Sequence, residues 1–331
     1  MNETGGATFP SMTLSPEPRG LRQKLTLAGA LCALGLGLGW PGLMAEEPLP
    51  DGPRLTAPYR YGDDELIIDE VFQSHLPGTL KKYSLRLSVH PRLGDWENND
   101  HMRLTTVLRY GLTDNCELSA GSNLYFSHGH GTIRAFEDNG AADLRLGVKF
   151  DLGQFLFRGW DTGAGLDYEI PVRHPPAELT DGLRHSRPYV TFSHRLKAHP
   201  HLRIFVGMHG DIITRTGLPG TFGKNAFHES SSGLTGGWVI DRGNLHYTFE
   251  ASVDTTRVFA RTEEDIYTIR PGVIWEIPTR RDPQLMTHWQ VGVSLNDTYG
   301  PGGNSMGASF KLRYSQELKR KSHREPAVVT P

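Results

Sequence analysis

The sequence predicts an all-β fold, a transmembrane antiparallel up-and-down β-barrel of about twelve strands. Residues 141–152 alternate apolar and charged side chains, as an extended strand with two different faces does. Similar stretches of roughly ten residues, the length that spans an outer membrane, recur about a dozen times. Many of the 38 glycines and 22 prolines fall between these stretches, where tight turns connect strands.

The alternation within residues 141–152 defines the two faces. A soluble, half-buried strand would show the same alternation, so its length and recurrence are what favour a membrane barrel. The charged face carries Asp143, Arg145, Lys149 and Asp151. The apolar face carries Ala142, Leu144, Leu146, Val148, Phe150 and Leu152.

Composition excludes several classes of protein. The net charge of -2 gives no basic excess, so we expect no nucleic-acid partner. A mean hydropathy of -0.42 excludes a bundle of membrane helices but is compatible with a barrel, because half of each barrel strand faces a polar lumen. No cofactor or metal site is predicted.

The N-terminus reads as a targeting signal. A basic region ending at Lys24 precedes the apolar residues 25–38, and small residues end at Ala45. We predict that residues 1–45 are a cleaved signal peptide, with the alternative of an uncleaved anchor disfavoured by the shortness of the apolar run. The long leader suggests an internal start codon. Cleavage would leave Cys116 as a lone cysteine, with no internal disulfide.

Residues 46–80 interrupt the strand pattern. They hold five prolines, an acidic run at 63–65 and one short amphipathic stretch at 66–72. We predict an extended periplasmic lead-in, with a small plug inside the lumen as the alternative. The barrel is then expected over residues 81–315, followed by a polar C-terminal tail at 316–331.

Twelve strands are expected, an even number, as in single-chain bacterial barrels. Connections after even-numbered strands should be short and periplasmic, and those after odd-numbered strands longer. The first six strands are predicted at residues 82–90, 101–111, 116–127, 141–153, 160–172 and 187–197. The second six are predicted at residues 201–214, 231–240, 245–258, 265–278, 287–298 and 306–315.

Aromatic residues give an independent indication. Outer-membrane barrels carry aromatic girdles on their lipid face at the water interface. In the predicted strands, nine aromatic residues fall on the apolar face at the periplasmic end. They are Tyr83, Tyr110, Phe150, Trp160, Trp238, Tyr247, Trp275, Trp289 and Tyr314.

Residues 101–153 also resemble a known family. The turn R-Y-G-L-T-D-N at 109–115, the Glu117-Leu118 pair and the strand G-A-A-D-L-R-L-G-V-K at 140–149 are similar to the outer-membrane putative transporters of the MetA pathway of phenol degradation. The resemblance implies a barrel that carries small, in part aromatic, solutes. The chain departs from such barrels after Tyr314, where a basic tail follows.

The polar strand faces supply the candidate lumen residues. A positive row on the first, second and last strands, which adjoin in a closed barrel, could select anionic solutes. The alternative is that opposite charges pair and fill a narrow interior. The residues are Arg86, Arg103, Arg109, Asp143, Arg145, Lys149, Asp167, Glu169, Arg203, Glu250, Arg270, Glu276, Lys311 and Arg313.

The function predicted from these features is a passive outer-membrane channel for small, aromatic or anionic solutes, not an enzyme. Its expected partners are outer-membrane lipid, the barrel assembly machinery and the solute. One alternative is a structural or adhesive barrel with a blocked lumen. Another is a lipid hydrolase using Ser127 and His128, which lie too close along one strand to pair well. The sequence predicts no oligomeric state.

Overall fold

A computed structural model describes residues 68–91, 101–127, 139–172, 180–216, 220, 227, 229–256, 265–277 and 287–318. All of them belong to one compact unit, Leu55–Pro331. The predicted signal peptide, most of the lead-in and nearly all of the C-terminal tail therefore lie outside the described residues. Within the described ranges, no helix is long and apolar enough to cross a membrane.

The described residues form thirteen β-segments. The first seven are β1 (Ser84–Pro91), β2 (His101–Thr113), β3 (Cys116–Ser127), β4 (Asn139–Ala141), β5 (Asp143–Gly153), β6 (Asp161–Pro171) and β7 (Leu183–Arg195). The others are β8 (Leu202–Arg215), β9 (Ser231–Arg242), β10 (Leu245–Thr255), β11 (Ile266–Ile277), β12 (Thr287–Gly300) and β13 (Gly303–Glu317).

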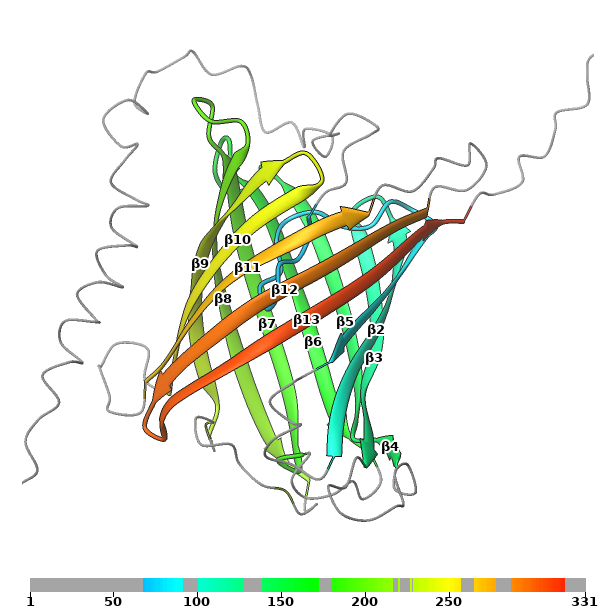
Figure 1. Ribbon diagram of the computed structural model, residues 1–331, viewed down its shortest axis with the longest axis vertical. Coiled ribbons are helices and arrows are strands. Elements are labelled where there is room, and N and C mark those ends of the chain that lie inside the picture. Colours follow the sequence, from blue (N-terminus) through cyan, green and yellow to red (C-terminus); the bar gives the residue numbers. More distant parts are fainter. Residues whose placement is uncertain are drawn as a thin grey trace, which may run out of the picture. The chain divides into compact units, whose positions relative to one another are not determined.

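The sheet closes on itself. Apart from β4 and β5, neighbouring strands in the sequence pair antiparallel, and β1 also pairs with β13, so the first and last strands meet (Figure 1). Because β4 and β5 both pair with β3, they count as one interrupted strand. The predicted fold, a closed antiparallel barrel of twelve strands, is confirmed. Closure leaves no unpaired sheet edge, as a membrane-spanning sheet requires.

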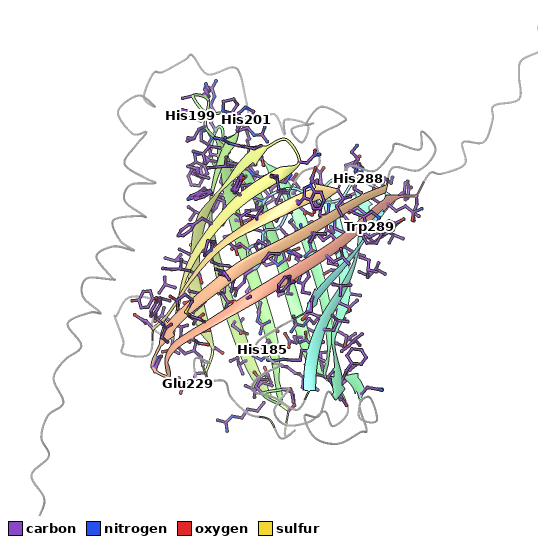
Figure 2. The ribbon with its side chains drawn as sticks, in the orientation of Figure 1. His185, His199, His201, Glu229, His288 and Trp289 are labelled. Carbon is purple, nitrogen blue, oxygen red and sulfur yellow. The ribbon has the colours of Figure 1, made fainter. Side chains whose placement is uncertain are left out.

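Most of the short turns that the structure describes lie at one end of the barrel, which we call the short-turn end, whereas the two-residue turn between β12 and β13 lies at the other end. Asp114 and Asn115 join β2 to β3, and Gly243 and Asn244 join β9 to β10. Gly243 adopts φ 60°, a backbone conformation that glycine reaches without strain. His199 and His201 in the β7–β8 turn mark the same end in Figure 2.

Some predicted boundaries need correction. β7 begins at Leu183 rather than at residue 187, and β13 runs to Glu317, two residues into the predicted tail. The connection predicted at residues 299–305 is a tight turn of two residues between Gly300 and Gly303. Gly303 has φ 93°, which makes this sharp reversal accessible and lets both strands extend further than expected.

The alternation in residues 141–152 holds except at its start. Leu144, Leu146 and Phe150 lie on the outside, exposed by 40–45%. Ala142 is instead fully buried against Tyr125. The strand is interrupted at Ala142, between β4 and β5, so the side chain of Ala142 does not face outward with the other apolar residues.

The exterior is that of an outer-membrane barrel. Large apolar side chains from strands around the barrel are exposed, including Leu108, Met208, Leu234, Val293 and Leu295, each by 42–56%. Most of the buried side chains are polar or charged, which inverts the pattern of a water-soluble protein. Lipid, rather than water, is therefore the solvent that suits this outer face.

Candidate functional site

The lumen contains a segment of the chain itself, residues 68–80, which we call the plug. It is the blue loop inside the barrel in Figure 1. The plug is a hairpin, because the Val71 N–H donates to the Ser74 carbonyl at 3.1 Å and the Leu76 N–H to the Asp69 carbonyl at 2.9 Å. Its tip is therefore formed by residues 71–74.

Both ends of the plug point to the short-turn end. Arg203, the second residue of β8 after a short turn, donates to the Ile68 carbonyl at 2.8 Å. The Leu80 N–H donates at 3.0 Å to Glu117, the second residue of β3 after another short turn. The hairpin therefore enters and leaves the lumen at one end and does not thread through the barrel.

The plug is also anchored by apolar contacts. Ile68, Val71 and Leu76 are 0–1% exposed and form a core cluster with Phe205, Val239 and Ile274 of the wall. Each buried aliphatic side chain of this kind contributes about 1.5–3 kcal/mol. The periplasmic lead-in that we favoured from the sequence is thus corrected for residues 68–80, because these side chains find apolar partners inside the barrel.

Asp69 of the plug faces buried basic side chains of the barrel, which we call the basic wall: Arg86, Arg109, Lys149, Lys311 and Arg313. Its carboxylate pairs with the Arg86 guanidinium and lies 4.0 Å from the Arg109 Nη1. The Lys149 Nζ donates to the Asp69 carbonyl at 2.8 Å. Asp69 is 2% exposed, so these cations offset the cost of burying its charge.

Glu70 is bound by the other half of the wall. Its carboxylate pairs with Arg109, with the Lys311 Nζ at 3.1 Å and with the Arg313 Nη2 at 2.8 Å. Arg313 Nη2 also donates to the Glu70 carbonyl at 3.0 Å, and Lys311 donates to the Val71 carbonyl. The predicted positive row on the first, second and last strands thus converges on two carboxylates of the plug.

The cations fix the charge state of both plug carboxylates. Burial alone would raise the pKa of Asp69, but Arg86, Lys149, Arg109 and Arg313 hold that pKa below its ordinary value of 3.8. The pKa of Glu70 likewise lies well below its ordinary 4.5, because Arg109, Lys311 and Arg313 outweigh the effect of burial. Both groups are therefore ionised at neutral pH.

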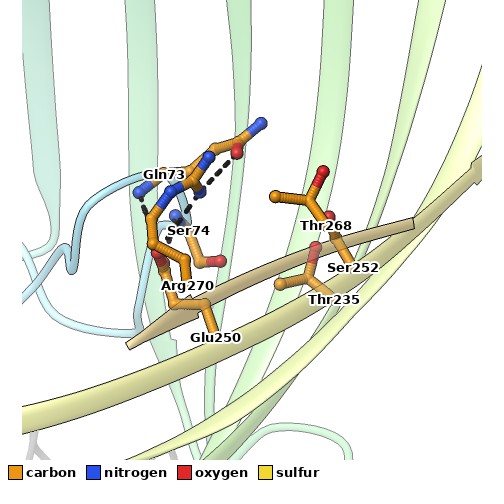
Figure 3. Close-up of a pocket in the computed structure, with 7 residues that line it drawn as sticks. All are labelled: Gln73, Ser74, Thr235, Glu250, Ser252, Thr268 and Arg270. Carbon is orange, nitrogen blue, oxygen red and sulfur yellow. Dashed lines mark hydrogen bonds and ion pairs between the residues drawn. The ribbon is translucent and has the colours of Figure 1, made fainter. Parts of the chain in front are cut away.

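The tip of the plug contacts the opposite wall. The Glu250 carboxylate accepts hydrogen bonds from the Ser74 N–H at 2.8 Å and from the Gln73 N–H at 3.3 Å. The Arg270 guanidinium donates to the Gln73 side chain at 2.5 Å and lies 3.5 Å from Glu250 (Figure 3). A small pocket adjoins the tip and is completed by Thr235, Ser252 and Thr268 (Figure 3).

The second arm of the plug, residues 75–80, is held by an aromatic stack. The His75 ring stacks on Tyr189 with centroids 4.3 Å apart, and its Nε2 lies 3.0 Å from the Asp167 carboxylate. Together with the contacts above, the plug touches side chains on all sides of the closed barrel. A segment with such contacts can lie only in the interior.

A second charged cluster lines the lumen at the opposite end from the short turns, and we call it the outer ladder. Arg145 bridges Asp143 at 3.3 Å and Glu169 at 3.2 Å. Arg187 bridges Glu169 at 3.0 Å and Asp211 at 3.1 Å. His185, which Figure 2 shows at this end, continues the row to Asp211 and Asp181.

The fourteen predicted lumen residues thus fall into groups. Five basic ones meet the plug carboxylates or their backbone, and Arg203, Asp167, Glu250 and Arg270 bind other parts of the plug. Asp143, Arg145 and Glu169 belong to the outer ladder. Glu276 lies apart, accepting from Gln290 at 2.9 Å and lying 3.4 Å from His246. Arg103 lies opposite Tyr125 in the β2–β3 register.

The nine predicted girdle residues all lie within four residues of the short-turn end of their strands. Phe150, Tyr247, Trp275 and Trp289 are exposed by 37–47%. Trp289 and Tyr314 are cross-strand partners with ring centroids 4.8 Å apart. In Figure 2, Trp289 lies at the same end of the barrel as His199 and His201.

Sequence reasoning missed the plug's functional residues, namely Asp69, Glu70 and His75. The signal was present, since two acidic residues interrupt an apolar run just before the first strand. Of the predicted hydrolase pair, Ser127 ends β3, and His128 lies outside the described residues. Among the described residues, no group of three or more His, Cys, Asp or Glu side chains is arranged to hold a metal ion.

Comparisons with known proteins give structural likeness only. No protein-family model and no curated protein matches the chain. An outer membrane channel from Pseudomonas putida F1 is 12% identical, with a TM-score of 0.47, over 75% of this chain and 99% of that one. The NanC porin is 13% identical, with a TM-score of 0.42, over 71% of this chain and 100% of that one. The KdgM porin in complex with disordered oligogalacturonate is 8% identical, with a TM-score of 0.41, over 71% of this chain and 99% of that one. At these scores the likeness carries no functional argument.

Proposed function

We propose that the protein is an outer-membrane channel for small solutes whose resting state is closed by the plug. The observation that carries the proposal is the mode of attachment. The plug is a hairpin held by ion pairs, hydrogen bonds and a small apolar cluster, and both of its ends lie at the short-turn end. Such a segment can leave the lumen without breaking a covalent bond or a barrel strand.

The lumen exposed by withdrawal would favour anions. The cations that hold Asp69 and Glu70 would then face water with fewer carboxylates near them, and a cluster of positive charge on the lumen wall attracts anionic solutes. The resemblance of residues 101–153 to putative transporters of phenol degradation adds aromatic solutes as candidates. We propose that the short-turn end faces the periplasm, as short turns do in bacterial barrels.

Single-channel recording tests this proposal. The full-length protein should give rare, brief openings in a planar bilayer. The variant Asp69→Asn/Glu70→Gln keeps the shape of the plug but removes both of its charges, so it should open far more often, with anion preference. Folding of each protein is checked by heat-modifiable migration in gels.

The second candidate is a structural barrel with a permanently blocked lumen. The filled interior favours it, since Arg86, Arg109 and Arg313 are each at most 5% exposed. If correctly folded full-length protein and the charge-neutralised variant are both silent, this second function replaces the channel.

A further inference from the structure

The basic wall that holds the plug carries more charge than the plug neutralises. Three buried carboxylates lie against five buried cations in the part of the chain that the structure describes. The carboxylates belong to Asp69, Glu70 and Glu117, which are 2–6% exposed. The cations, which are 1–5% exposed, belong to Arg86, Arg109, Lys149, Lys311 and Arg313.

The two plug carboxylates meet at a single guanidinium. Arg109 pairs with Glu70 through Nη2, and its Nη1 lies 4.0 Å from Asp69 Oδ2. A planar guanidinium presents its donors in a fixed fork, so it sets the spacing of two carboxylates that it bridges. The other cations flank this fork, with Arg86 on the Asp69 side and Arg313 on the Glu70 side.

Withdrawal of the plug would vacate this arrangement and leave its donors in place. The wall would keep Glu117, 3.6 Å from Arg109, against all five cations. Cations in a partly enclosed site that have lost their partners gain from a new anion, because leaving them unpaired costs free energy.

We propose that this basic wall is a binding site for solutes carrying two carboxylates a short distance apart, and that the plug occupies it as an internal mimic of such a solute. The inference rests on the proposed channel function and names its substrate class. A short aliphatic dicarboxylate such as succinate would place one carboxylate between Arg109 and Arg86, and the other between Arg109 and Arg313. A monocarboxylate would satisfy half of the site.

Binding of the solute and docking of the plug then exclude one another. The site is buried while the plug is docked, so the dicarboxylate binds only the undocked state and shifts the population toward it. The open fraction rises in proportion to one plus the ratio of ligand concentration to dissociation constant, about tenfold at ten times that constant. The transported solute would in this way open its own channel.

Planar-bilayer recording of the full-length protein tests the regulation. Succinate at ten times its dissociation constant for the undocked state should raise the open probability about tenfold. Propionate at the same concentration and ionic strength should raise it by about twofold or less. The variant Arg109→Gln should lose the response to succinate. The matched control Arg187→Gln, which removes a cation of the outer ladder, should keep it. Equal effects of succinate and propionate on the full-length protein would overturn the proposal.

Calorimetry separates this proposal from the channel function. Full-chain Asp69→Ala/Glu70→Ala protein in detergent, with its fold checked by heat-modifiable migration, should bind succinate at least tenfold more tightly than propionate. Adding Arg109→Gln should abolish the difference. If the bilayers are silent but this binding is found, the channel function fails and the dicarboxylate site stands. If succinate binds no more tightly than propionate, the site itself is excluded.

Discussion

Arg109 on β2 and Glu70 of the plug form a buried ion pair, with both side chains at most 8% exposed. The pair joins the wall of the barrel to the plug, which is not part of the β-sheet. Removing one partner of a buried pair costs about 3–5 kcal/mol, because the other charge is left without compensation. This contact should therefore control whether the plug stays docked.

Substituting Arg109 gives the first prediction. Arg109→Gln should weaken docking, and since water entering the lumen offsets part of the loss, we expect the open-to-closed ratio to rise by about ten- to hundredfold. Arg187→Gln in the outer ladder, which does not contact the plug, should change the ratio by less than about threefold. Open probabilities from single-channel records decide the matter. Equal open-to-closed ratios for the two variants would contradict the conclusion that the Arg109–Glu70 pair controls docking of the plug.

The second prediction concerns Gly292 and Gly272, which leave room for Phe72 at the plug tip. A Cβ at Gly292 would lie 3.0 Å from the Phe72 ring, and one at Gly272 would lie closer still. Overpacking of this kind costs about 1–3 kcal/mol, so Gly272→Ala should favour undocking and raise the open probability. At Gly236 the nearest atom to a Cβ is 3.7 Å away, so Gly236→Ala should have no effect.

A double substitution sharpens that test. In protein that already carries Phe72→Ala, the clash is absent, and adding Gly272→Ala should change the open probability no further. An undiminished effect of Gly272→Ala in this background would place its origin in the wall, for instance at Ser294, whose Cβ lies 2.9 Å from the same position.

The third prediction concerns acidification. The pKa values of Asp69 and Glu70 are lowered in the docked state, where Arg86, Arg109, Lys149, Lys311 and Arg313 face them. Their contribution to docking is therefore complete at a pH above their ordinary pKa values of 3.8 and 4.5, which we assign to the undocked state. This contribution is lost as the pH falls through the lower pKa values of the docked state. Open probability should stay constant between pH 7.5 and about 5. Opening at about pH 6 would show that another group controls docking.

The fourth prediction concerns the aromatic girdle. Trp275 and Trp289 are 47% and 37% exposed on the outer face near the short turns. Their indole rings should lie at the lipid headgroup level, as interfacial tryptophans do. In liposomes, lipids brominated near the headgroup should quench their fluorescence more than lipids brominated near the chain ends. The double variant Trp275→Phe/Trp289→Phe should reduce that difference without abolishing it, because Trp160 and Trp238 of the same girdle remain. Stronger quenching from the chain ends would refute the placement.

The strands were predictable because their information is local. Period-two alternation and turn residues are read within a dozen residues, and the third predicted strand, residues 116–127, coincides with β3. The same alternation indicates which charges face inward. Errors arose where a turn was tighter than its composition suggested, as at residues 301–302, or where a strand is interrupted, as at Ala142.

The plug was not predictable in this way, because its contacts are distant in sequence. Glu70 and Arg313 are 243 residues apart, and Asp69 and Lys149 are 80 apart. A basic row can be read from the strands, but the acidic partner that occupies it depends on cross-strand register and on the path of a segment without periodicity. Residues 66–72 gave an amphipathic pattern that fits either the periplasm or the lumen.

The most direct test of the account is the reversal potential, under a salt gradient, of single channels formed by a variant that lacks residues 68–79. We expect steady open currents with a reversal potential on the anion-selective side, because the basic wall is exposed once the plug is gone. A heat-modifiable, correctly folded variant that passes no current, or one that prefers cations, would contradict the claim that the plug closes an anion-selective channel.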